Sequence, residues 1–84
     1  MYEYYFTFRS VTRAQLAVQQ LNGRRIAAEL VRIPQSIAAM GCGYAVRVQK
    51  ADAYLTSAAL HDAGITYERV FGMEYNGEAK EVPL

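Results

Sequence analysis

The chain has 84 residues with one cysteine and one histidine, and its nine basic and eight acidic residues give a net charge of +1. This balance gives no electrostatic reason to expect a nucleic acid or an anionic membrane as partner. One cysteine cannot form an internal disulfide, and one His with one Cys falls short of the four ligands of a structural zinc site.

Size, hydropathy and cysteine usage set further expectations. A domain this small buries only roughly two thirds of its unfolded surface, so it commonly needs self-association for stability, and we expect a homodimer or higher oligomer. No stretch approaches the ~18 apolar residues of a membrane span, and the N-terminus does not resemble a signal peptide. A lone thiol without such a signal favours a reducing compartment, so the expected location is cytoplasmic.

The first elements read as a strand followed by a helix. Residues 2–9 alternate between two faces, and aromatic side chains at period two predict a strand. Ser10 or Thr12 offers an N-cap, and Asn22-Gly23 is expected to end the helix through a left-handed residue. The apolar face of this helix consists of Ala14, Ala17, Val18 and Leu21.

The next elements are a pair of strands. The sequence predicts a strand over residues 28–33, ended by Pro34, which cannot donate to a ladder. A second strand is expected over residues 44–49, where Tyr44, Val46 and Val48 share one side.

The last elements are a helix, a strand and a tail. Residues 50–52 are expected to open a second helix that Gly64 closes, and residues 67–71 read as a fourth strand. The tail contains Asn76-Gly77, a favoured hairpin-turn pair, so it is expected to form a short ribbon or to pack on a neighbour.

This β-α-β-β-α-β order predicts an α+β, ferredoxin-like fold for a single domain over residues 1–84. Its core would be residues 2–71, with a four-stranded antiparallel sheet and both helices on one face. Residues 72–84 would add a short tail or hairpin. The other face of the sheet would then be covered by water, a ligand or a partner.

The most unusual local sequence is Gly41-Cys42-Gly43. Glycines permit positive φ and the close approach of another molecule, and clustered turn amides stabilise an anion such as a thiolate, the nucleophilic form of cysteine. The arginines at or near strand ends could add positive potential around Cys42: Arg9, Arg32 and Arg47. The alternative is an inert buried thiol, because free cysteine is among the most buried residue types.

A family resemblance adds to this interpretation. The runs Tyr4-Tyr-Phe-Thr-Phe-Arg-Ser-Val-Thr-Arg-Ala, Val31-Arg-Ile-Pro34 and Cys42-Gly43-Tyr-Ala-Val-Arg47 resemble the DUF3343 family of selenium/sulfur carrier-like proteins, over residues 4–71. The resemblance implies that Cys42, beside Gly43, holds sulfur or selenium as a persulfide or perselenide. A donor such as a cysteine desulfurase would supply the sulfur, and an acceptor of unknown identity would remove it.

Other residues offer weaker alternatives. His61 lies beside Asp62 on the second predicted helix and reads as an exposed surface histidine, while Ser10 and Ser36 have no sequence context of a serine nucleophile. The tyrosines leave open a base-stacking RNA-binding domain, which has the same element order. Val46 occupies the position of a second stacking aromatic, which argues against it.

We therefore expect a carrier or binding protein without its own turnover, and no bound metal or cofactor. Two alternatives stay open at this point. The first is a self-associating interaction module in which Cys42 is structural, and the second is an RNA-binding domain. Thiol reactivity separates the carrier from the interaction module, since a carrier needs an accessible thiolate.

Overall fold

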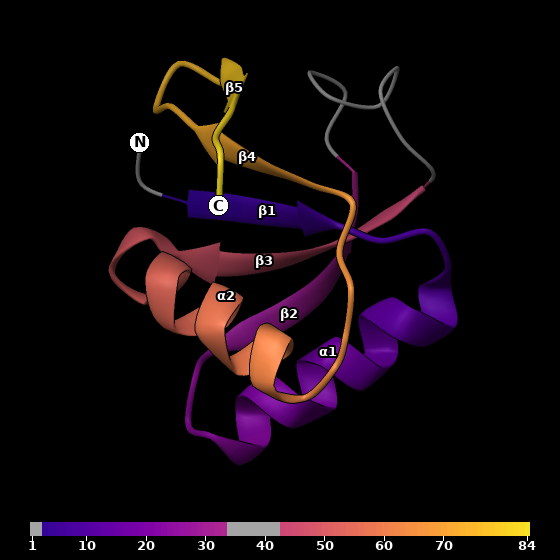
Figure 1. Cartoon of the computed structure of the whole chain (residues 1–84). Helices are drawn as coiled ribbons and strands as arrows, with labels where there is room; N and C mark the ends of the chain where they lie inside the picture. Colours follow the sequence, from indigo (N-terminus) through magenta and orange to yellow (C-terminus); the bar gives the residue numbers. More distant parts are fainter. Residues whose placement is uncertain (1–2, 34–42) are drawn as a thin grey trace.

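The structure is a computed structural model, and it describes residues 3–33 and 43–84 (Figure 1). Two helices and a short 3-10 turn accompany the strands: α1 (Val11–Gly23), η2 (Lys50–Asp52) and α2 (Ala53–Asp62). The strands are β1 (Glu3–Thr7), β2 (Ala28–Arg32), β3 (Tyr44–Gln49), β4 (Arg69–Met73) and β5 (Ala79–Glu81).

The strands form one sheet in the order β2-β3-β1-β4-β5, and every neighbouring pair is antiparallel. The α+β class, the two helices and the antiparallel sheet agree with the prediction. The strand count does not, because the sheet has five strands and not four. The additional strand β5 comes from the tail, which pairs with β4 along Phe71, Gly72 and Met73.

A tight turn brings the tail onto the sheet edge. The Gly77 N–H donates to the Glu74 carbonyl at 3.0 Å, and the Glu74 N–H donates to the Glu78 carbonyl at 2.8 Å. Gly77 has φ +87, the left-handed conformation that glycine adopts without strain. Asn76 Oδ1 accepts a hydrogen bond from the Glu78 N–H at 3.0 Å. The hairpin expected at Asn76-Gly77 is thereby confirmed.

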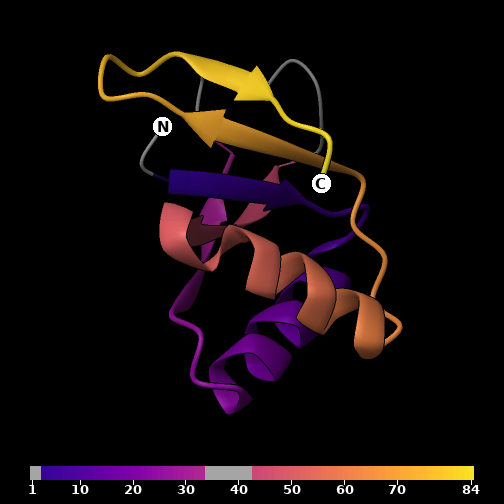
Figure 2. The ribbon, with the colours of Figure 1, turned by 60° about the vertical axis from the view of Figure 1, so that its left-hand side comes forward.

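Both helices pack against the same face of the sheet (Figures 1 and 2). Alternation along β1 sends the fully buried Phe6 to this face, opposite the buried Val46 of β3 and Val70 of β4. The helices contribute small and branched side chains that let them approach the sheet closely. The buried residues of this main core are Phe6, Phe8, Ala14, Ala17, Leu21, Ile26, Ala28, Val46, Val48, Ala59, Leu60 and Val70.

The opposite face of the sheet carries a second, smaller apolar cluster. Its members Tyr5, Ile33, Ala45, Phe71 and Met73 are no more than 9% exposed within the single chain. These apolar side chains are therefore little exposed within the single chain, and the covering of this face by water, a ligand or a partner stays a prediction. Self-association stays a prediction.

The two helices end in the same hydrogen-bond pattern. Ile65 N–H donates to the Leu60 carbonyl and Ile26 N–H to the Leu21 carbonyl, each at 2.9 Å, as in a Schellman motif. Gly64, at φ +71, takes the left-handed position after α2, as predicted. After α1 the left-handed residue is Arg25, at φ +63, and neither residue of Asn22-Gly23 has a positive φ.

The fourth strand begins later than predicted, at Arg69 in place of residue 67. Tyr67 is taken up by contacts outside the sheet ladder, since its ring meets Phe6 edge-on at 4.9 Å between centroids. Its hydroxyl also lies 2.7 Å from the Ser57 hydroxyl on α2. These contacts hold Tyr67 against Phe6 and α2, just before the chain enters β4.

Candidate functional site

The structure describes both residues that border the segment containing Cys42, residues 34–42: Ile33 before it and Gly43 after it. The Ile33 N–H, after β2, donates to the Gly43 carbonyl, before β3, at 2.9 Å. Arg32 and Tyr44 are cross-strand partners one residue further into the sheet. Cys42 and Gly41 lie outside the described residues, so their candidate roles stay predictions. Cys42 directly precedes Gly43 in the chain.

Gly43 is exposed and has open space around it. A Cβ added there would meet no atom within 4 Å, and its φ lies outside the left-handed region. The structure therefore gives no conformational reason for glycine at position 43. A side chain at this position would extend into this open space.

Arg32 stacks on an aromatic ring beside Gly43. Its guanidinium carbon lies 5.7 Å from the centroid of Tyr44, a cation–π distance. Arg32 is exposed, and the Tyr44 ring is at the border of exposure, with 36% of the residue accessible. Of the three predicted arginines, Arg32 is the one that the register places next to Gly43.

Arg9 lies beyond the end of β1 and is largely exposed. Its guanidinium forms an ion pair with Glu68 at 3.6 Å between Nη2 and Oε2. Thr7 closes the adjacent strand ends, because its hydroxyl donates to the Arg69 carbonyl and accepts from the Arg69 N–H. Arg9 therefore adds a positive charge, partly compensated by Glu68, to the end of the sheet where Arg32 and Tyr44 lie.

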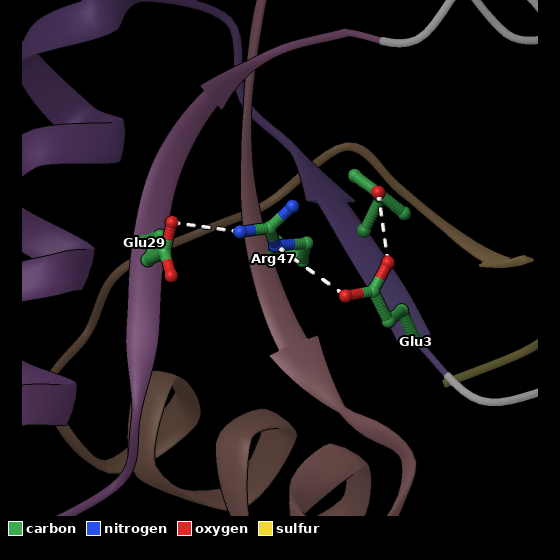
Figure 3. Close-up of polar contacts among 4 residues, drawn as sticks. Glu3, Glu29 and Arg47 are labelled. Carbon is green, nitrogen blue, oxygen red and sulfur yellow. Dashed lines mark hydrogen bonds and ion pairs between the residues drawn. The ribbon is translucent and has the colours of Figure 1, made fainter.

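Arg47 lies further along β3 and is engaged by two carboxylates (Figure 3). Its Nη2 is 2.7 Å from Glu29 Oε2 on β2, and its Nε is 3.6 Å from Glu3 Oε2 on β1. Tyr5 Oη donates to the other oxygen of Glu3 at 3.2 Å. The positive charge of Arg47 is thus compensated within the sheet, which makes it the least available of the three arginines for a thiolate.

This network shifts two ionisation equilibria. Burial, reinforced by the charge of Glu3, raises the pKa of Tyr5 despite the opposing influence of Arg47. Burial tends to lower the pKa of Arg47, but its interactions with Tyr5, Glu29 and Glu3 raise it on balance. Both raised pKa values favour the protonated forms, neutral Tyr5 and charged Arg47. The hydrogen bonds and ion pairs of this network therefore connect β1, β2 and β3.

The remaining candidates have structural roles. The Ser10 hydroxyl accepts the Arg13 N–H at 3.3 Å and caps α1, as predicted. His61 is exposed on α2 and borders a surface hollow of about 340 Å³ together with Tyr67. Ser36 lies outside the described residues. Among the described residues, neither Ser10 nor His61 has the partners of a catalytic nucleophile or base.

Tyr5 and Tyr44 do not form a base-stacking surface. Tyr5 is opposite Arg47 in the sheet, and Tyr44 is three residues from Arg47 on β3, so the two tyrosines point to opposite faces. Tyr5 is also only 6% exposed. The aromatic arrangement that would favour an RNA-binding domain is therefore not found in these two residues.

Neither a metal-binding cluster nor a membrane-spanning helix is found in the described ranges. Residues 3–33 and 43–84 contain no group of three or more His, Cys, Asp or Glu side chains that could hold a metal ion. Within the same ranges, neither helix has the length and apolar character needed to cross a bilayer.

Comparison with known proteins identifies the family. Residues 3–71 match the family model described as "Putative Se/S carrier protein-like". The chain belongs to this selenium/sulfur carrier-like family. The match confirms the resemblance noted in the sequence, and the matched range includes Cys42 and both strands that border its segment. No curated protein and no solved structure matches the chain.

The sequence did not indicate the Arg32–Tyr44 pair or the Glu3–Arg47–Glu29 network. Both depend on which residues stand opposite each other in neighbouring strands. Alternation along each strand gives the face of a residue, but the register across strands comes from the turns and from packing. The only available signal was the charged residues placed among apolar ones in three predicted strands.

Proposed function

We propose that this protein is a sulfur or selenium carrier that holds the transferred atom on Cys42 as a persulfide or perselenide. The observation that carries the proposal is membership of the carrier-like family over residues 3–71, a range that includes the chain's one cysteine. We take β1 to β4 with the two helices as a ferredoxin-like unit that β5 extends.

The chemistry is a thiol–persulfide exchange. The Cys42 thiolate attacks the outer sulfur of a donor persulfide; a new S–S bond forms on Cys42 and the donor's S–S bond breaks. The transferred sulfur keeps its proton, and the donor leaves as a thiolate, so no external oxidant or reductant is consumed. Transfer to an acceptor thiolate repeats the exchange in the opposite direction.

The carrier depends on partners at both steps. Cys42 is the chain's only cysteine, so no second thiol of the same chain can resolve the loaded form. The donor is a protein with a reactive persulfide, such as a cysteine desulfurase, and the acceptor is a second molecule with a thiolate. The protein thus acts without turnover of its own.

The first experiment measures loading directly. The wild-type chain and Cys42→Ser are incubated with a cysteine desulfurase and L-cysteine, and the intact mass is recorded without reducing agent. We expect the wild type to gain one sulfur atom and the variant to gain none. Equal loading of both proteins, or no loading of the wild type, rejects the proposal.

A second experiment uses the open space at Gly43. Gly43→Val is compared with Gly23→Val, because neither glycine has an atom within 4 Å of an added Cβ and neither has a positive φ. If a partner approaches Cys42 beside Gly43, the first variant loads more slowly and the second loads like the wild type. Thermal unfolding by circular dichroism verifies that both variants are folded.

A further inference from the structure

Arg32 differs from the other strand-end arginines because it forms no ion pair with a carboxylate of residues 3–33 and 43–84. Arg9 is paired with Glu68 and Arg69 with Glu81, whereas Arg32, within the described ranges, contacts the Tyr44 ring. The two segments outside those ranges, residues 1–2 and 34–42, contain no Asp or Glu. No carboxylate side chain of this protein therefore compensates the charge of Arg32.

The geometry prepares Arg32 to bind a carboxylate. The cation–π contact with Tyr44, at 5.7 Å, restricts the Arg32 side chain, so less side-chain entropy is lost when its N–H groups form a bidentate pair. Arg32 is exposed, so its guanidinium can be reached by another molecule. Arg and Tyr are also the residue types enriched at the energetic centres of protein interfaces.

The position of this pair links it to Cys42. Arg32 and Tyr44 are cross-strand neighbours, and the Ile33–Gly43 hydrogen bond lies one residue beyond them. A molecule bound to the pair is therefore held beside the residue to which Cys42 is covalently joined. The proposed carrier function requires a donor to be held in this neighbourhood.

We propose that Arg32 and Tyr44 form the docking contact for the protein that donates sulfur, with Arg32 binding an Asp or Glu side chain of that protein. The inference rests on the proposed carrier function. Charge complementarity points to an acidic protein surface. RNA would require several uncompensated cations, but Arg9 and Arg69 at this end of the sheet are already paired with carboxylates.

The test separates docking from thiol chemistry. The probes are a cysteine desulfurase supplied with L-cysteine, and neutral iodoacetamide, whose reaction rate reports the thiolate fraction of Cys42. We compare the wild type with Arg32→Gln and, as a matched control for the lost charge, Arg24→Gln. Arg24 is partly exposed and is paired with Asp62, on α2, at 3.7 Å.

For Arg32→Gln we expect desulfurase loading at subsaturating donor to fall at least about fivefold, with alkylation by iodoacetamide unchanged. Raising the salt concentration should slow loading of the wild type more than loading of this variant. Arg24→Gln should load like the wild type. Tyr44→Leu, which removes the stacking ring, should lose part of the rate and provides a second variant if Arg32→Gln unfolds.

The other outcomes reject either the carrier function or the docking contact, and the two cases can be distinguished. No loading of the wild type rejects the carrier function itself, whereas equal loading of the wild type and Arg32→Gln rejects only the docking contact. If alkylation and loading fall together, Arg32 stabilises the thiolate and is not a docking residue. Salt-dependent binding of a single-stranded RNA that is lost in Arg32→Gln would assign the pair to nucleic acid.

Discussion

The two helix ends allow a matched test of backbone strain. Both end in a Schellman motif, but the left-handed position is glycine after α2 and arginine after α1. A left-handed conformation costs a side-chain-bearing residue roughly 1–2 kcal/mol, and glycine's extra freedom in the unfolded chain costs about 0.4–1 kcal/mol. Arg25→Gly should therefore stabilise the protein by about 0.5–1 kcal/mol, and Gly64→Ala should destabilise it by a similar amount.

The assay is urea unfolding followed by circular dichroism, with thermal unfolding as a second measurement. A change of 1 kcal/mol moves the Tm of a domain this size by roughly 4–8 °C, which is readily measured. The double variant measures any coupling between the two helix ends, because Arg24, beside Arg25, forms an ion pair with Asp62, two residues before Gly64. A loss of stability in Arg25→Gly, or an unchanged Gly64→Ala, would refute the strain argument.

Three further variants test the core and the polar network. Phe6→Ala removes a fully buried ring that meets Tyr67 edge-on, and should cost about 3–5 kcal/mol in urea unfolding; a loss below about 1 kcal/mol would contradict the assigned core. Thr56 is fully buried and its hydroxyl has no hydrogen-bond partner in the part of the chain that the structure describes, so Thr56→Val should raise the unfolding free energy by about 1 kcal/mol, and a decrease would show that the hydroxyl is satisfied. The pKa of Tyr5 is raised on folding, so the stability contributed by this group is present below pH 10 and lost as the pH rises through the folded pKa. Wild-type stability should consequently fall more steeply above pH 10 than that of Tyr5→Phe, and parallel curves would exclude the shift.

The regular elements were predictable because their residues carry strong local patterns. The alternating aromatics of β1 and the Ser10 cap of α1 each depend on neighbours in sequence, and both agree with the structure. The strand β5 carries no such pattern, since Ala79-Lys80-Glu81 is short and mostly polar. It is a strand because the turn at Gly77 places it beside β4, so the one sequence signal for it was the turn pair Asn76-Gly77.

The end of α1 also shows that local composition does not determine every boundary. Asn22-Gly23 has the composition of a stop signal, yet α1 continues through Gly23 and the left-handed residue is Arg25. Packing of Ile26 in the main core, together with its hydrogen bond to Leu21, determines where the chain leaves the helix. Local composition therefore gave the approximate position of the end but not the residue.

For the candidate site, the sequence identified Cys42 through its glycine neighbours and its family resemblance. The sequence could not distinguish among Arg9, Arg32 and Arg47 as residues that stabilise a Cys42 thiolate. Their partners separate them, because Arg47 is held between Glu3 and Glu29 while Arg32 stacks on Tyr44. These partners lie on other strands, and only the register brings them together.

The hydrogen bond between Ile33 and Gly43 has a consequence for protein engineering. It fastens both borders of the intervening residues to the sheet, so a replacement of different length would start and finish at the same two points. For a chain segment between two fixed points, doubling its length costs only about 0.6 kcal/mol of closure entropy. The scaffold should therefore accept exchanged or lengthened inserts at this position, and reactive sequences from relatives could be grafted onto one common support.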